Sequence, residues 1–250
     1  MIFDILKSIE IFKTTKKIDI TKLPSRGFFY DKDFFIKIKK VESDDILYYK
    51  NYFKPDNPVI IIELIKQIVK KNTFYPKGYS FDDVRSVDVV YLFFKLIEYT
   101  TKAPLYLSHI NPLTGTIDKI PVTDLNFKYF DPSNEYKLVD GEFISKSGFK
   151  FRIPSIKVED TLTKFITLKY YMGKREYMDA NYDFIYFLGK KNNVSDQEIE
   201  TLLDIFSEMD RDEISTIVED FKPFARYSVV SDGVEYSLDG KLDLENAFDI

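Results

Sequence analysis

The sequence predicts an α+β fold of two related halves, each a small antiparallel sheet with a helical segment inserted between its first strand and its last hairpin. Apolar and basic residues alternate from Phe34 to Lys39, which is the period of a half-buried strand. Helical patterns follow, and a hairpin pattern at residues 105–122 ends this half. The second half repeats these patterns in the same order. A mostly helical single domain with peripheral hairpins is the alternative.

A turn precedes the first strand. In LPSRG, at residues 23–27, Pro24 fixes φ and Gly27 can adopt a positive φ, while the Ser25 hydroxyl can close the turn locally. Because the turn leads into an alternating strand, we interpret these residues as structural.

Helices are predicted to begin near Ser43, Pro58 and Ser80. Ser43 is a favourable N-cap residue, and the two aspartates after it suit the positive end of the helix dipole. Pro58 suits the first turn, where a helix needs no N–H donor. We expect the second helix to end near Lys71 and the third near Thr100.

The second half aligns with the first. Residues 148–162 match residues 33–47 without a gap, at an offset of 115, and the closing hairpin resembles residues 117–127 at an offset of 121. Two matches in the same order favour an internal duplication. Further helices are expected at residues 158–172, 177–191, 195–209 and 211–221. Ser195 and Glu198 have the spacing of a capping box.

The chain is therefore divided into residues 1–18, a first half at 19–130 and a second half at 131–250, with the boundary in the turn-rich stretch 131–134. Residues 1–18 are expected to form an amphipathic helix and a polar linker. The apolar stripe of this helix is a candidate partner-binding surface. It consists of Ile2, Ile5, Leu6, Ile9 and Phe12.

Composition disfavours or excludes several classes of function. The net charge of −5 provides no basic field for a nucleic-acid backbone. The absence of cysteine excludes disulfides and thiolate metal sites. No apolar run approaches the roughly 20 residues that cross a bilayer, and the N-terminus lacks the features of a signal peptide. We expect a protein made in a cytosol, with no membrane partner.

No catalytic constellation is predicted. His109 is the single histidine and lies in the predicted hairpin, so it is expected to be neither a catalytic base nor a zinc ligand. Acidic clusters at residues 44–45, 82–83 and 210–213 fall at predicted helix starts, where the helix dipole explains them. Glycine-rich phosphate loops are absent from the sequence. We expect a protein that is not an enzyme and has no cofactor, metal or small-molecule substrate.

One basic stretch suggests an alternative function, the binding of single-stranded nucleic acid. Its lysines lie near three aromatic residues, and such a combination can stack on single-stranded nucleic acid. The acidic remainder of the chain disfavours this, and an edge strand protected by lysines is the simpler interpretation. The residues concerned are Lys37, Lys39 and Lys40, with Phe28, Phe29 and Tyr30.

LPSRGFFY, followed by the alternating strand and an acidic helix start, resembles the opening of the T4-type bacteriophage baseplate protein family. The similarity covers about residues 20–130, through the helix ending near Thr100 and the hairpin LYLSHINPLTGTIDKIPVTDLNF. Several members of that family carry cysteine pairs at such hairpins, where this chain has Leu107 and His109. That difference argues against a metal site here.

The resemblance implies a structural subunit or assembly chaperone of a contractile-tail baseplate hub that contacts other hub proteins. It implies a location in the bacterial host cytoplasm during assembly, or in the virion. A nucleic-acid-binding accessory protein is the alternative.

Overall fold

The fold is a mixture of helices and small antiparallel sheets, as the sequence predicts. The computed structural model describes residues 14–51, 58–111, 114–123, 136–140, 142–145, 148, 150–174, 195–201, 216 and 228–237. Within these ranges no helix is long and apolar enough to cross a membrane.

The first sheet is formed by β1 (Lys16–Ile18), β2 (Ile36–Ile38) and β3 (Thr73–Phe74), in the order β1-β2-β3. The alternation predicted for β2 is confirmed, because Ile36 and Ile38 are buried while Lys37 lies on the opposite face. The prediction that this strand is an edge is wrong: β2 is central, and β1 is an edge strand.

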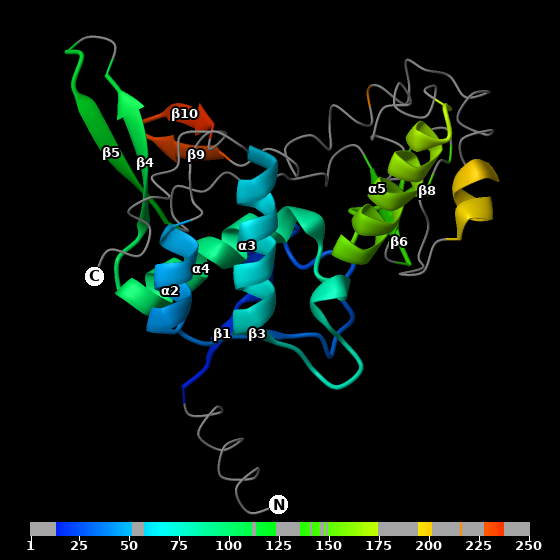
Figure 1. The fold of residues 1–250 in the computed structure, drawn as a ribbon, viewed down its shortest axis with the longest axis horizontal. Coiled ribbons are helices and arrows are strands. Elements are labelled where there is room, and N and C mark those ends of the chain that lie inside the picture. Colours follow the sequence, from blue (N-terminus) through cyan, green and yellow to red (C-terminus); the bar gives the residue numbers. More distant parts are fainter. Residues whose placement is uncertain are drawn as a thin grey trace, which may run out of the picture.

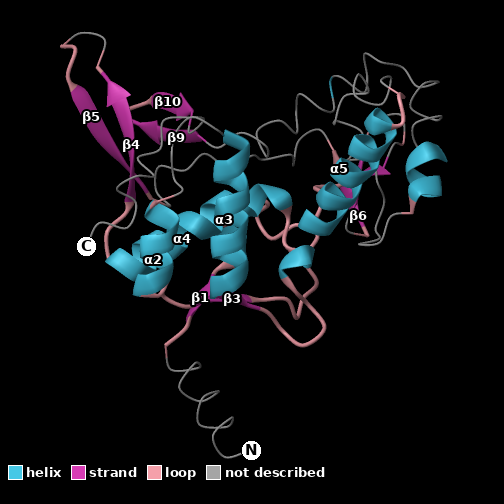
Figure 2. Ribbon diagram, viewed as in Figure 1, coloured by secondary structure: helices cyan, strands magenta, loops and turns pink. Residues whose placement is uncertain are grey.

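Three helices lie between the first sheet and two hairpins in Figure 2. They are α2 (Ser43–Lys50), α3 (Pro58–Asn72) and α4 (Val89–Thr101). The predicted start of α3 is confirmed. The N-cap of α2 is Glu42, so the prediction of Ser43 as cap is wrong by one residue.

The predicted helix from Ser80 to Thr100 is interrupted at its start. A capping box between Ser80 and Asp83 closes the short 3-10 turn Phe81–Asp83. Arg85 is then extended and forms an isolated antiparallel bridge with Ser155, so the chain cannot continue as a helix. After a second 3-10 turn, Ser86–Asp88, α4 begins at Val89.

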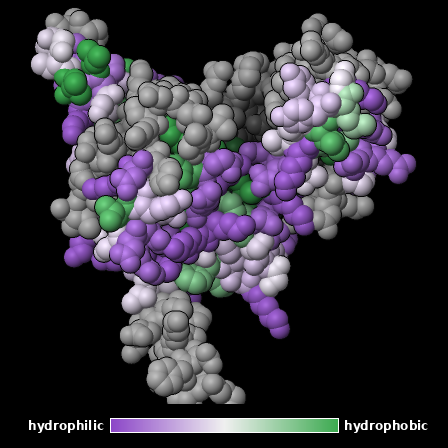
Figure 3. All heavy atoms as spheres, in the orientation of Figure 1, coloured by the Kyte–Doolittle hydropathy of each residue, from purple (hydrophilic) through white to green (hydrophobic). Residues whose placement is uncertain are grey.

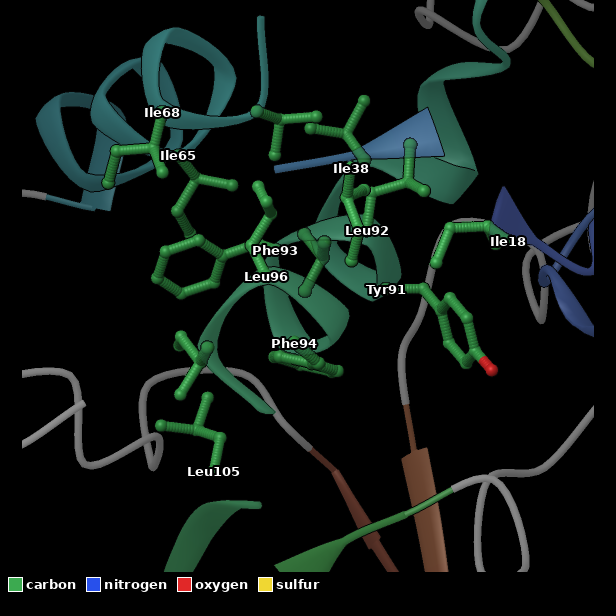
Figure 4. Packing of buried hydrophobic residues seen from close by; sticks show 14 of the residues in the cluster. Ile18, Ile38, Ile65, Ile68, Tyr91, Leu92, Phe93, Phe94, Leu96 and Leu105 are labelled. Carbon is green, nitrogen blue, oxygen red and sulfur yellow. The ribbon is translucent and has the colours of Figure 1, made fainter. Parts of the chain in front are cut away.

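The main core surrounds α4. Its residues from Val89 to Phe94 are all buried, as are Leu96 and Ile97. Figure 4 shows their side chains packed against those of the first sheet and α3. The same cluster includes Leu105 from the first hairpin and two residues from the predicted second half, Ile156 and Val229.

The two predicted hairpins are confirmed. The first consists of β4 (Leu105–Ile110) and β5 (Ile117–Val122), and the second of β9 (Ser228–Ser231) and β10 (Val234–Ser237). They lie side by side in Figure 1, and the rings of His109 and Tyr236 meet edge to face, with centroids 4.7 Å apart. The closing hairpin therefore packs against the hairpin of the first half.

A second sheet contains β6 (Lys137–Val139), β7 (Glu142–Ile144) and β8 (Lys150–Phe151), and α5 (Ile156–Tyr171) follows it. The strand-to-helix order of β2 and α2 recurs in β8 and α5, although β8 contains only the first of the three residues, 151–153, that align with β2. Ser195 and Glu198 form the predicted capping box. A further group of residues is buried around α5, including Phe143, Phe151, Leu162, Phe165 and Ile199.

Some predictions fall outside the described residues. These are the N-terminal helix, the boundary at 131–134, the helix at 177–191, residues 202–209 of the helix at 195–209 and nearly all of the helix at 211–221. The duplication and the division into halves remain predictions.

Candidate functional site

The LPSRG turn is the first candidate, and its backbone is unusual. After the 3-10 turn Ile20–Lys22, three of the next residues have positive φ: Arg26 at 53°, Gly27 at 78° and Phe29 at 70°. A Cβ added to Gly27 would lie 3.4 Å from the Ile20 carbonyl oxygen. The positive φ predicted for Gly27 is confirmed. Positive φ in non-glycine residues persists only where surrounding contacts fix the backbone.

Asp88 provides those contacts. Its Oδ1 accepts a hydrogen bond from the Ser25 backbone N–H at 2.8 Å, and its Oδ2 accepts from the Ser25 hydroxyl at 2.7 Å. The Tyr30 hydroxyl donates to the same Oδ2 at 2.7 Å. Ser25 also closes the turn locally, because the Gly27 N–H donates to its Oγ at 3.3 Å. The carboxylate therefore holds Ser25, in the middle of the turn, and Tyr30, which follows the turn, against the start of α4.

Arg85 holds the turn from another side. Its guanidinium donates to the Phe29 carbonyl oxygen at 2.5 Å and to the Ile153 carbonyl oxygen at 3.4 Å, and its backbone N–H donates to the Tyr30 hydroxyl at 2.8 Å. The guanidinium lies 5.8 Å from the centroid of the Phe29 ring, and Arg152 lies at the same distance from that ring. We call Ser25, Phe29, Tyr30, Arg85 and Asp88 the turn junction.

The turn junction joins the two predicted halves. The Ser86 N–H donates to the Pro154 carbonyl at 3.1 Å, and the Ile156 N–H donates to the Val84 carbonyl at 2.8 Å. Ser155 then caps α5 through the Val158 N–H. The extended segment that interrupts the predicted helix is therefore the segment that pairs with the second half.

Electrostatics at the junction are dominated by burial. Burial raises the pKa of Asp88 to about 6, although the hydrogen bonds from Ser25 and Tyr30 and the charge of Arg85 act in the opposite direction. Burial and the charge of Asp88 raise the pKa of Tyr30 well above its usual range. Burial lowers the pKa of Arg85. Burial, and then the charge of Arg85, lower the pKa of Arg152 to about 10.

The junction has no geometry for nucleophilic catalysis on a substrate. Ser25 and Asp88 are both 0% exposed, so no substrate atom reaches the Ser25 hydroxyl. The Asp88 carboxylate accepts hydrogen bonds from Ser25 and Tyr30. The chemistry of the arrangement is that of a buried structural network.

The other predicted positions lie elsewhere. His109 is on β4 and contacts Tyr236, and Pro24 is buried within the turn. Asp44 and Asp45 lie in the first turn of α2, as predicted. Across the part of the chain that the structure describes, no group of histidine and acidic side chains could hold a metal ion. The stripe from Ile2 to Phe12 lies outside the described residues.

The predicted grouping of lysines with the aromatics of the turn is wrong. Phe28 and Phe29 pack on Phe143, with ring centroids 5.5 and 5.4 Å from it. The side chain beside Lys37 is instead Phe35, with the Lys37 Nζ 5.3 Å from the ring centroid.

The second candidate is an exposed apolar tip on the first hairpin. Ile110 and Ile117 are direct partners across β4 and β5, and 68% and 67% of their surfaces are exposed. In Figure 3 hydrophobic atoms stand at the end of this projecting hairpin. On the same face, Ser108 pairs with Lys119 and Tyr106 with Pro121. We call Ile110 and Ile117 the hairpin tip.

Comparison of the chain with protein-family models, with curated proteins and with solved structures finds no match.

Proposed function

We propose that this protein is a non-enzymatic component of contractile phage tail baseplate hub assembly, and that it acts through protein–protein contacts. The sequence support is the LPSRGFFY resemblance. The structural support is the contrast between the two candidate sites. The LPSRG turn is occupied by contacts within the chain, whereas the hairpin tip exposes large apolar side chains.

The hairpin tip is the observation that carries this proposal. Two isoleucines directly opposite each other favour a strand pair, but about two-thirds of each remains in contact with water. Burying such side chains on a partner stabilises the complex by about 1.5–3 kcal/mol each. Two side chains bury far less surface than the roughly 800 Å² per partner of a stable interface. The tip is therefore proposed to insert into an apolar pocket within a larger contact.

The test is an assembly assay with the double substitution Ile110→Ser and Ile117→Ser. We expect the variant to keep the thermal stability of the wild type and to lose hub assembly in a complementation experiment in infected cells. The matched control is Ser108→Ala with Lys119→Ala, the neighbouring pair on the same face, which should assemble normally. Normal assembly by the isoleucine variant would refute the role of the tip.

A second measurement distinguishes a permanent hub subunit from an assembly chaperone. A hub subunit remains in purified mature particles and is detected there by mass spectrometry. An assembly chaperone is absent from the particles but co-purifies with hub proteins from infected cells. Absence from both preparations would contradict the proposed function.

A further inference from the structure

The Asp88 carboxylate is a buried acid that hydrogen bonds stabilise more than any cation does. Its side chain is 0% exposed, and among the described residues no lysine or arginine forms an ion pair with it. The Arg85 guanidinium donates its hydrogen bonds to the carbonyl oxygens of Phe29 and Ile153 instead. The hydrogen bonds from Ser25 and Tyr30 therefore lower the pKa of Asp88 more than the charge of Arg85 does.

Three donors converge on this carboxylate. The Ser25 backbone N–H donates to Oδ1, while the hydroxyls of Ser25 and Tyr30 both donate to Oδ2. The two hydroxyl oxygens in turn accept hydrogen bonds from the backbone N–H groups of Gly27 and Arg85. In the described structure neither hydroxyl has a second acceptor. This arrangement fits an ionised carboxylate, which has acceptor sites only.

A proton on Asp88 conflicts with this arrangement. Oδ1 can keep the Ser25 N–H as the carbonyl oxygen of the neutral acid, so the proton belongs on Oδ2, to which two hydroxyls already donate. The new O–H group then donates to one of those hydroxyl oxygens, and that hydroxyl loses its acceptor. A buried donor without an acceptor is destabilising. Protonation therefore removes the cost of a buried charge and at the same time weakens the contacts that hold the turn.

The segment between the two hydroxyl residues has a strained backbone. Arg26 and Phe29 have φ of 53° and 70°, and non-glycine residues persist in this region only where surrounding contacts fix the backbone. Ser25 precedes Arg26 and Tyr30 follows Phe29, so the two hydroxyls hold the strained segment from its two sides. Loss of either hydrogen bond therefore allows residues 26–29 to change their backbone angles.

Asp88 is the group of the turn junction that titrates near neutral pH. Tyr30 and Arg85 are the titratable groups that face it, and burial raises its pKa to about 6 against their effect. Burial raises the pKa of Tyr30 well above its usual range, so this hydroxyl stays neutral. A guanidinium stays charged at this pH. The more distant Asp31 and Asp83 act on Arg85, whose pKa their charges raise.

We propose that Asp88 is a pH-sensitive switch of the LPSRG turn. In its ionised form it holds Ser25 and Tyr30, and the strained segment keeps the observed conformation. When Oδ2 takes up a proton from the solvent, the side chain becomes neutral, one hydroxyl turns away and the segment relaxes, while the rest of the fold is retained. The switch is a property of this chain alone and does not depend on the proposed role in hub assembly.

The experiment is an NMR titration of the isotopically labelled full-length protein from about pH 4.5 to about pH 8. The signals followed are the backbone N–H groups of Ser25, Gly27 and Phe29, with Val229 of β9 as the reference. We expect the three turn signals to shift together with a midpoint near pH 6, while the Val229 signal stays unchanged. Relative to its intrinsic rate, exchange of the Gly27 N–H should be at least about tenfold faster below the midpoint.

Three variants assign the titration. Asp88→Asn cannot ionise, so its turn signals should show no midpoint. Tyr30→Phe removes one donor to the ionised carboxylate, so the midpoint should rise by about one pH unit. Asp82→Asn is the matched control, because it removes a carboxylate of the nearby 3-10 turn Phe81–Asp83 that makes no contact with Asp88, and it should titrate as the wild type does.

The inference would be overturned by turn signals of the wild type that show no midpoint between about pH 5 and about pH 7. A midpoint that persists in Asp88→Asn, or that disappears in Asp82→Asn, would assign the titration to another acid and overturn it as well. A Val229 signal that moves together with the turn signals would show unfolding of the whole fold in place of a local change, which also contradicts the switch.

Discussion

Gly27 shows how a single backbone angle selects a residue. Its φ of 78° lies in the left-handed region, where a β-branched side chain is strained. Gly27→Val should therefore lower the free energy of unfolding by about 1–3 kcal/mol, measured by denaturant titration. Gly27→Asn is the control, because asparagine tolerates this region and should cost less. Equal stability of the valine variant and the wild type would contradict the observed turn.

Asp88 makes stability depend on pH, and burial fixes the sign. Because its folded-state pKa of about 6 lies above the usual 3.8, the folded protein binds the proton more tightly than the unfolded chain. The contribution of Asp88 to stability is therefore greatest at low pH. It falls as the pH rises through the window from about 4 to 6, by about 2–3 kcal/mol.

The measurement is the free energy of unfolding against pH for the wild type and Asp88→Asn. Other groups titrate in both proteins, so the difference between the two curves isolates Asp88. We expect the wild type to lose stability relative to the variant as pH rises across this window. Parallel curves would show that Asp88 has an ordinary pKa in the folded state.

Among the elements, α3 and α5 are linked by one lysine. The Lys66 Nζ lies 3.4 Å from a Glu159 carboxylate oxygen, 3.2 Å from one of Asp160 and 3.4 Å from one of Glu63. Burial lowers the pKa of Lys66, but the three acids outweigh it and the net shift is upward. The charged form is therefore favoured at the contact between α3 and α5.

Lys66→Met should lower stability by about 1 kcal/mol, because the acids of α5 lose their cation. Lys70→Met, on an exposed position of the same helix, should change stability by less than about 0.5 kcal/mol. Thermal melts of the two variants provide the comparison. An equal loss of stability in the two variants would mean that the ion pairs of Lys66 with α5 contribute nothing to stability.

The N-terminal stripe is a prediction from sequence alone. Leu6→Asp with Ile9→Asp places charges on that stripe, and burying charge against apolar surface is costly. If the stripe docks on a partner, which we favour, the double variant keeps its melting temperature and loses hub assembly. If the stripe docks within the chain, the melting temperature falls. Unchanged stability with unchanged assembly would refute both forms.

Local patterns predicted the elements well, and long-range polar contacts were missed. The alternation at Phe34 to Ile38 and the hairpin at residues 105–122 are local features, and the structure has both. Nothing local to LPSRG indicates that Ser25 bonds to a residue 63 positions later. The available signal was Arg85 and Asp88, two charged residues among the valines at 84, 87 and 89, but the pattern places both within the helix predicted from Ser80 to Thr100.

At the scale of the whole molecule, the turn junction lies where the predicted halves meet. The main core and the group buried around α5 are bridged by residues 84–86 pairing with residues 154–156. The turn contacts Arg85 of this segment, and it also contacts Asp88, which follows the segment. The burial of Ser25 within the LPSRG turn is therefore explained by its place in the fold.

The central claim is that the turn serves the fold while the exposed surface serves assembly. Hub assembly by Ser25→Ala, measured per folded molecule at a temperature where the variant is folded, tests this most directly. The variant loses a buried hydrogen bond to Asp88, so its stability should fall by about 1–3 kcal/mol, while assembly per folded molecule should equal that of the wild type. Wild-type stability combined with lost assembly would contradict the claim, because it would place Ser25 in the function itself.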